Sequence, residues 1–158
     1  MRMENKTNVM RMLDVAHIKY KTYFYDPEKY LTGADIAAAL NQNPEMVFKT
    51  LVTINKNNKL FVFMVPVNME LNLKYAAMCV GEKSLNMLPQ RELLNKVGYV
   101  HGGCSPIGMK KLFTTVLDTS ATNFDTIIFS AGTRGAQVGI SVHDLNKIIP
   151  IQFGNICE

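Results

Sequence analysis

The 158-residue sequence contains no tryptophan, three cysteines and three histidines. Cys79, Cys104 and Cys157 are odd in number and far apart, so they form neither a disulfide framework nor a CxxC-type metal or redox site. The histidines are scattered as well, and no HExxH-type ligand spacing occurs. We therefore expect a reducing compartment and neither a metal nor another cofactor.

Long apolar runs and targeting signals are also missing. The apolar run at residues 60–67 is far shorter than the ~20 residues that a membrane helix needs. The N-terminal sequence MRMENKTNVMRMLD mixes charges and lacks the apolar segment of a secretory signal. We expect no membrane association and a cytoplasmic location. The formal net charge of +4 favours an anionic partner.

The chain length fits one domain over residues 1–158, and no repeat, linker or low-complexity stretch interrupts it. Hydrophobic periodicity predicts strands over residues 18–25, 48–55, 60–67, 111–117, 126–130 and 136–142. Helices are predicted over residues 6–17, 32–40, 72–80 and 89–96, with a helical turn after Asn43–Pro44 and a last helix from Ser141 to before Pro150. Strands this close in sequence predict an α+β domain with a largely antiparallel or mixed sheet.

Alternation along two strands predicts which side chains share a face. In the first strand, Tyr23 lies on the face that points away from the expected core. Residues 48–55 and 60–67 flank the turn Lys56–Lys59 and predict an antiparallel hairpin. Lys49 shares one face of this hairpin with apolar neighbours, which is unusual for a lysine.

Glycines, which expose the backbone, are concentrated in the second half of the chain. Seven of the ten glycines fall between Gly98 and Gly139, mostly in the motifs GYVHGGCSPIG (98–108) and SAGTRG (130–135). Glycine is favoured where φ is positive or where a Cβ would block a ligand, and successive N–H groups suit an anionic or developing-anionic oxygen. The two motifs therefore predict a binding site that is formed by backbone.

Together with VFKTLV at residues 47–52, these motifs resemble the YbaK/EbsC-type aminoacyl-tRNA deacylases, and the resemblance covers nearly the whole chain. That family hydrolyses mischarged Cys-tRNA(Pro) and is related to the editing domain inserted in many bacterial prolyl-tRNA synthetases. The resemblance implies a curled, barrel-like mixed sheet, largely antiparallel, with helices packed outside it. It also implies hydrolysis in trans of Cys-tRNA(Pro) to free amino acid and intact tRNA, with prolyl-tRNA synthetase as a partner.

The resemblance further implies three catalytic positions. Lys49 matches the functionally required lysine, whose charge can neutralise a phosphate or the oxygen of an ester in the transition state. Gly102 and Gly103 match the glycine pair next to the aminoacyl group, where backbone donors can form an oxyanion hole. A snorkelling lysine and a plain turn are the alternative interpretations.

Substrate contacts are implied at further matching positions. Tyr23 matches a tyrosine at the pocket rim that can stack on the terminal adenosine, or it simply packs. Arg134 binds a phosphate or caps its loop. Gln137 stands where some relatives carry aspartate, and His101 where an aliphatic residue is common. The other expected contacts are Thr50, Ser105, Ser130 and Gly132, of which Ser105 also fixes the loop.

A protein nucleophile is not apparent. Cys104 with His101 as its base is disfavoured, because no regular element positions residues on either side of a glycine pair. The family resemblance implies instead that the substrate thiol or a ribose hydroxyl supplies reactive groups while the protein positions the ester. Two alternatives stay open: a deacylase for alanine or serine on tRNA, and a non-catalytic tRNA- or nucleotide-binding module of the same fold.

Overall fold

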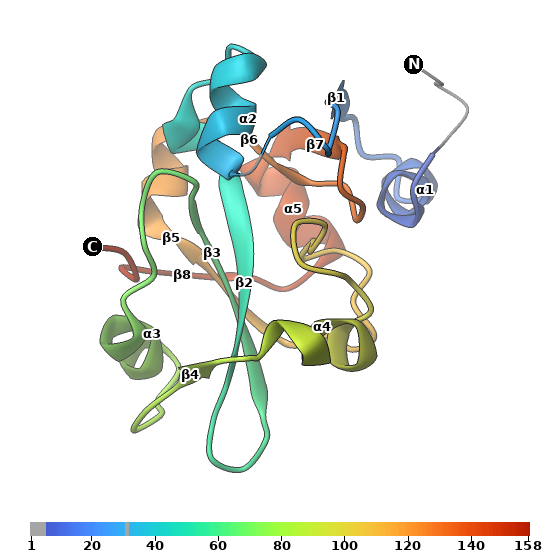
Figure 1. The fold of residues 1–158 in the computed structure, drawn as a ribbon. Helices are drawn as coiled ribbons and strands as arrows, with labels where there is room; N and C mark the ends of the chain where they lie inside the picture. The colour runs from blue at the N-terminus through green and yellow to red at the C-terminus, as the bar shows by residue number, and fades with distance from the viewer. Residues whose placement is uncertain (1–5, 31) are drawn as a thin grey trace.

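The computed structural model describes residues 6–30 and 32–158; residues 1–5 and 31 of the expected domain lie outside this description (Figure 1). The helices are α1 (Asn8–Val15), α2 (Gly33–Ala39), η1 (Pro44–Met46), α3 (Leu73–Cys79), α4 (Gln90–Val97), η2 (Thr119–Asn123) and α5 (Val142–Ile148). The strands are β1 (Lys21–Phe24), β2 (Phe48–Ile54), β3 (Leu60–Pro66), β4 (Asn86–Met87), β5 (Thr114–Asp118), β6 (Thr126–Ser130), β7 (Ala136–Ser141) and β8 (Gln152–Gly154). None of the helices in this part of the chain has the length and apolarity needed to cross a membrane.

The strands form two sheets with the orders β1–β7–β6 and β4–β2–β3–β5–β8. Neighbours are antiparallel except at β3–β5 and β5–β8, which are parallel. Val47, directly before β2, makes a parallel bridge to Ile128 of β6 and joins the two sheets. The predicted α+β class with a mixed, largely antiparallel sheet and outer helices is confirmed, although the sheets do not close into a full barrel in the described residues.

Polar caps determine where several helices begin. The Thr7 side chain accepts a hydrogen bond from the Met10 N–H at the start of α1, and Asn72 accepts from Tyr75 at the start of α3. Ser141 accepts from two N–H groups in the first turn of α5, which confirms the predicted start of the last helix. Gly98, with φ of 95°, ends α4 in the left-handed conformation and turns the chain into the first glycine-rich motif.

The main core lies between β6, β7, α1 and α5, with Val9, Leu13, Phe129, Ile140 and Leu145 fully buried or nearly so. A second cluster packs α3 against β3 and β5, and a third packs α4 against one face of the β2–β3 hairpin. Figure 1 shows β2 running through the middle of the molecule, with α2 at one end and α4 near the other. The strand β2, which carries Lys49 and Thr50, is therefore packed from several directions.

Several boundaries differ from the sequence-based prediction. The first strand begins at Lys21 rather than residue 18, because His17 adopts a φ of 58° and the Ile18 N–H bonds back to the Leu13 carbonyl. The strand predicted from residue 111 begins at Thr114, after a tight turn in which the Phe113 N–H donates to Lys111. The short strands β4 and β8 were not predicted, because two or three residues carry no readable periodicity.

Candidate functional site

The two glycine-rich motifs lie against each other. A Cβ added at Gly103 would be 3.1 Å from the backbone nitrogen of Arg134 and 3.1 Å from Cα of Thr133. One added at Gly102 would be 3.3 Å from Cγ of the Arg134 side chain. The absence of a side chain at Gly103 therefore allows the backbones of the two loops to touch.

Hydrogen bonds within the first loop hold its shape. The Gly103 N–H donates to the Val100 carbonyl at 3.0 Å. The Tyr99 hydroxyl donates across the loop to the Ile107 carbonyl, and burial raises the pKa of Tyr99 to about 12, so this donor stays protonated. Ser105 is fully buried, and its hydroxyl accepts from the Ile107 N–H at 3.4 Å. Ser105 thus lies inside the loop, consistent with the expectation that it fixes the loop.

The glycine pair offers fewer free donors than its sequence suggests. The Gly103 N–H is already used in the turn to Val100. Gly102 has a φ of 88°, and its N–H has no acceptor among the residues that the structure describes. Of the two glycines, Gly102 is therefore the one whose backbone is available to an anionic oxygen.

The second loop is organised by Ser130 and Arg134. The Ser130 hydroxyl accepts from the Gly132 N–H at 3.1 Å, so it closes the start of the loop. Arg134 Nη2 donates to the Pro27 carbonyl at 2.7 Å, and Nη1 lies 3.9 Å from the exposed Glu28 carboxylate. The Arg134 side chain remains 48% exposed, so it caps the loop while leaving part of the guanidinium in contact with solvent.

Tyr23, Ser130 and Gln137 are brought together on one face of the three-stranded sheet, because Gln137 is the register partner of both other residues. Tyr23 points away from the main core, but it packs against a smaller cluster around Val47 and Ile128. This packing explains why an outward-facing tyrosine is only partly exposed.

Gln42 is a neighbour of this face that the sequence analysis missed. Its Nε2 donates to Gln137 Oε1 at 2.9 Å, across 95 positions of sequence. The Gln42 Oε1 is buried and has no partner within the described part of the chain. No local pattern could have indicated this pair, because only tertiary folding brings the two amides together.

Lys49 lies on the same face of β2 as Val47. The parallel bridge between Val47 and Ile128 is isolated, so β6 does not pair with β2 at Lys49. The Lys49 side chain is 30% exposed, and its Nζ lies 3.5 Å from Oε2 of Glu70, which is 81% exposed. An ion pair this open contributes little, so the ammonium can move to another anion.

Thr50 projects from the opposite face of β2. Its neighbours on that face, Phe48 and Val52, belong to the main core and to the cluster that contains Cys104. The Thr50 hydroxyl oxygen is buried, and no partner for it is found in residues 6–30 and 32–158. Because an unpaired buried polar group is unfavourable by about 1–3 kcal/mol, such a group often marks the place of a missing ligand or water.

The backbone of Thr50 points toward an open edge of β2. The Val47 carbonyl accepts from Val67, so the odd-numbered residues bond to β3 and the even-numbered ones face outward. On this outer edge, β2 contacts β6 through Val47, and the Val52 carbonyl accepts from Leu88 at 3.0 Å. Between these two points no described strand pairs with it, so the N–H and C=O of Thr50 lie at a gap in the strand pairing of β2.

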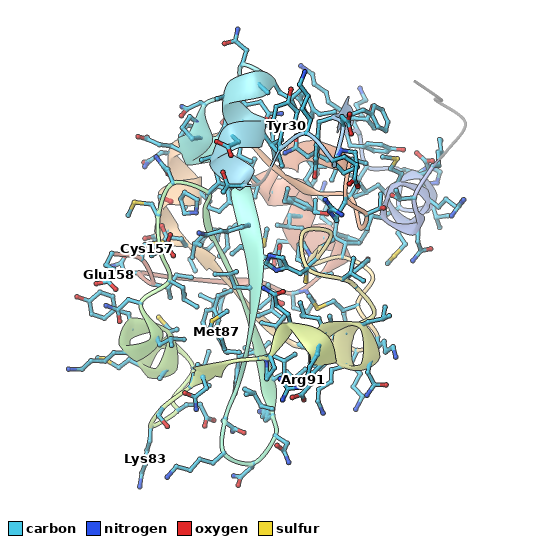
Figure 2. All side chains as sticks on the ribbon, viewed as in Figure 1. Tyr30, Lys83, Met87, Arg91, Cys157 and Glu158 are labelled. Atoms are coloured by element: carbon cyan, nitrogen blue, oxygen red, sulfur yellow. The ribbon has the colours of Figure 1, made fainter. Side chains whose placement is uncertain are left out.

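The environment of the cysteines disfavours a protein nucleophile. Cys104 is 8% exposed and packs with Val52, Leu93 and Val97. Burial raises the pKa of its thiol to about 12, so it stays neutral at physiological pH. Cys157, near the C-terminus (Figure 2), also has a pKa of about 12, mainly because of burial and then because of the Asp118 carboxylate.

Two open hollows lie elsewhere on the molecule. One, of about 540 Å³, is bounded by α1 and β1. The other, of about 680 Å³, lies between the tip of the β2–β3 hairpin and the C-terminal end of α4. Neither is lined by the predicted site residues, so the chemistry of the side chains and backbone, not the size of a cavity, locates the candidate site.

Comparison with known proteins identifies the family to which the chain belongs. The sequence model of the aminoacyl-tRNA editing domain matches residues 27–148, so the chain belongs to this family and the resemblance is confirmed. A relative from Enterococcus faecalis (strain ATCC 700802 / V583) is 39% identical over 154 residues, covering 97% of this chain and 94% of its own. That relative is named "Putative Cys-tRNA(Pro)/Cys-tRNA(Cys) deacylase EbsC".

Solved structures share the fold at lower identity. The crystal structure of the hypothetical protein APE2540 has a TM-score of 0.85 and 18% identity, covering 96% of this chain and 100% of that one. The crystal structure of "a putative trans-editing enzyme for prolyl tRNA synthetase" has a TM-score of 0.81 and 20% identity, with coverages of 96% and 98%. At these identities the matches show the fold alone.

Proposed function

We propose that the chain acts in trans as a single-domain aminoacyl-tRNA deacylase, with mischarged Cys-tRNA(Pro) as its preferred substrate. Hydrolysis would release cysteine and free tRNA and so preserve the fidelity of translation. Membership of the editing-domain family supports the reaction class, and the relative from Enterococcus faecalis supports the cysteinyl substrate. We further propose that prolyl-tRNA synthetase presents the tRNA, because a domain of this size has little surface for reading tRNA identity.

The gap in the edge of β2 is the observation that carries this proposal. The outward N–H of Thr50 lies where no described strand pairs with β2, and the N–H of Gly102 has no acceptor among the described residues. The loop that contains Gly102 packs beside β2 through Cys104. An ester carbonyl in this gap would develop negative charge in front of donors that are already in place. The Lys49 ammonium, held only by the exposed Glu70, can reach the carbonyl oxygen or a nearby phosphate.

The substrate thiolate attacks the ester carbonyl carbon, which forms a carbon–sulfur bond and a transient oxyanion. When this intermediate collapses, the bond to the ribose oxygen breaks and that oxygen takes up the proton that the thiol released. Water then opens the resulting thiolactone, which breaks the carbon–sulfur bond and releases cysteine. The neutral Cys104 is a poor attacking group, whereas the cysteinyl thiol of the substrate has an ordinary pKa of about 8.5 and is a few per cent thiolate at neutral pH. We therefore assign activation to the substrate thiol and positioning to the protein, which can lower the barrier by several kcal/mol.

The face formed by Tyr23, Ser130 and Gln137 supports the proposed substrate contacts. The ring of Tyr23 is partly exposed and can stack on the terminal adenosine. The solvent-exposed part of the Arg134 guanidinium can bind a phosphate. Ser130 and Gly132 act through the loop, because their mutual hydrogen bond sets its conformation.

Single-turnover deacylation of matched Cys-, Ser- and Ala-tRNA(Pro), with saturating enzyme from about pH 6 to about pH 9, tests the proposal. Saturation removes differences in tRNA binding, so the rates report chemistry. We expect the cysteinyl ester to react fastest, with a rate that rises toward the thiol pKa of about 8.5. Equal rates for all three esters would refute assistance by the thiol and indicate an activated water with a broader substrate range. Binding of tRNA without hydrolysis would identify a non-catalytic module.

A further inference from the structure

The hollow between the β2–β3 hairpin and α4 is strongly basic. Lys59, Lys96, Lys110 and Lys111 line it together with Asn58 and Asn95, and no acidic side chain contributes to its lining in the described residues. The four lysines carry four positive charges, which equals the formal net charge of +4 of the whole chain. A basic surface concentrated in this way attracts a polyanion.

The lysines of the hollow are available to a ligand. The ion pairs seen among the described residues involve Lys6, Lys49, Arg134 and Lys147, none of which belongs to the hollow. Lys110 Nζ donates to the Asn95 carbonyl at 2.7 Å, and Lys59 Nζ lies 5.3 Å from the centre of the Phe61 ring. These contacts orient two ammonium groups without neutralising them.

The hollow is connected to the candidate site by the first glycine-rich loop. At the base of this loop, the Lys110 N–H donates to the Val97 carbonyl at 3.1 Å, and a Cβ added at Gly98 would lie 3.5 Å from Cγ of Lys110. At its tip, Gly102 and Gly103 contact the second loop. A ligand that extends from the tip of the loop along its base therefore reaches the lysines.

We propose that the hollow binds the phosphate backbone of the RNA duplex that carries the aminoacylated 3′ end. This inference rests on the proposed function, which places the 3′ end at the loop tip. Lysine and asparagine side chains are typical phosphate contacts, which position a nucleic acid without reading its sequence. Such contacts add affinity for any tRNA and leave the choice of the amino acid to the candidate site.

The Lys59→Glu/Lys111→Glu double variant tests the inference, because both side chains are exposed and neither makes a backbone contact in the structure. Lys74→Glu/Lys83→Glu is a matched control with the same change of net charge, from +4 to 0, since each substitution removes two units. Lys74 lies on α3, and Figure 2 shows Lys83 next to β4, away from the C-terminal end of α4.

We call the Lys59→Glu/Lys111→Glu protein the hollow variant. The measurement is its affinity for uncharged tRNA, compared with that of the wild type, by fluorescence anisotropy at several salt concentrations. Loss of two phosphate contacts should lower the slope of log affinity against log salt by about 1.8. The advantage of the wild type over the hollow variant should then shrink about tenfold from about 50 to about 200 mM salt. If the control variant lost as much affinity, the loss would be due to net charge alone and the inference would be wrong. The inference would also be wrong if the hollow variant bound tRNA as tightly as the wild type.

A short substrate separates this inference from the proposed function. The hollow variant should hydrolyse the cysteinyl ester of adenosine, which has no duplex, as fast as the wild type, but lose at least about tenfold in kcat/KM on Cys-tRNA(Pro). Equal loss on both substrates would contradict a role in RNA binding. If the wild type hydrolysed neither substrate, the proposed function would fail, while the anisotropy result would still decide whether the hollow binds RNA.

Discussion

Replacing Gly103 by alanine should force the two glycine-rich loops apart. The added methyl carbon would lie 3.1 Å from the Arg134 nitrogen, 3.1 Å from Thr133 Cα and 3.2 Å from the Thr133 carbonyl carbon. These are backbone atoms, which cannot rotate away as the end of a side chain can. Gly103 is not among the glycines with positive φ, so the effect should come from contact rather than from backbone strain.

Overpacking of this kind destabilises a folded protein by about 1–3 kcal/mol. For a chain near 150 residues, each kcal/mol corresponds to about 2–4 °C in Tm, so Gly103→Ala should melt about 2–12 °C below the wild type. The loops would also separate by some tenths of an ångström. Because a misplacement of about 1 Å can lower a rate about 100-fold, we expect single-turnover deacylation to fall by about tenfold or more.

Gly81→Ala provides the control. Gly81 has a φ of 73°, and a Cβ there would meet no atom within 4 Å. This substitution should lower Tm through backbone strain of about 1–2 kcal/mol while leaving deacylation unchanged. If Gly103→Ala melted and deacylated like the wild type, contact between the loops could not be what holds the site together.

Further predictions concern single side chains and pH. Lys49→Ala should lower deacylation about 100-fold with an unchanged melting curve, and Lys49→Arg should restore little of it; a folded alanine variant with near wild-type turnover would refute the role of the charge. Gly102→Ala should also reduce turnover, because its φ of 88° is strained for alanine and the methyl group meets Arg134; this role is wrong if rate and Tm both match the wild type. Cys104→Ser should keep deacylation within about threefold of wild type and leave its pH profile unchanged, because a thiol with a pKa of about 12 does not ionise below pH 9; an inactive but folded serine variant would restore the nucleophile hypothesis.

Local chemistry made much of the fold predictable. The caps at Asn72 and Ser141 satisfy N–H groups within a few residues, and the hairpin of β2 and β3 joins two adjacent runs through a short polar turn. Each of these features depends on neighbouring residues alone. The helix starts and the hairpin could therefore be predicted before any tertiary contact was known.

Contacts between distant segments could not be predicted in this way. The parallel pairing of β3 with β5 and the hydrogen bond between Gln42 and Gln137 arise only when the chain has folded. The same holds for the contact of Gly103 with Arg134, although each motif was recognisable alone. The sequence thus indicated which residues to examine, while their mutual positions depended on long-range packing.

The position of β2 between the two sheets explains why the candidate site forms there. An unpaired strand edge exposes donors and acceptors and normally invites association with another chain. Here the gap is bounded by the Val47 bridge to Ile128 at one end and by the pairing of Thr53 with Met87 at the other, so the strand is held in place on both sides of it. Thr50 can therefore present its N–H from a rigid element, whereas a free loop would have to be ordered when the substrate binds. Lys49, on the other face, adds a mobile charge to this fixed donor. Because β2 contacts both sheets, it can present the fixed backbone N–H of Thr50 and the movable ammonium of Lys49 close together. The oxygen of an ester that becomes negatively charged in the transition state would be stabilised by both groups.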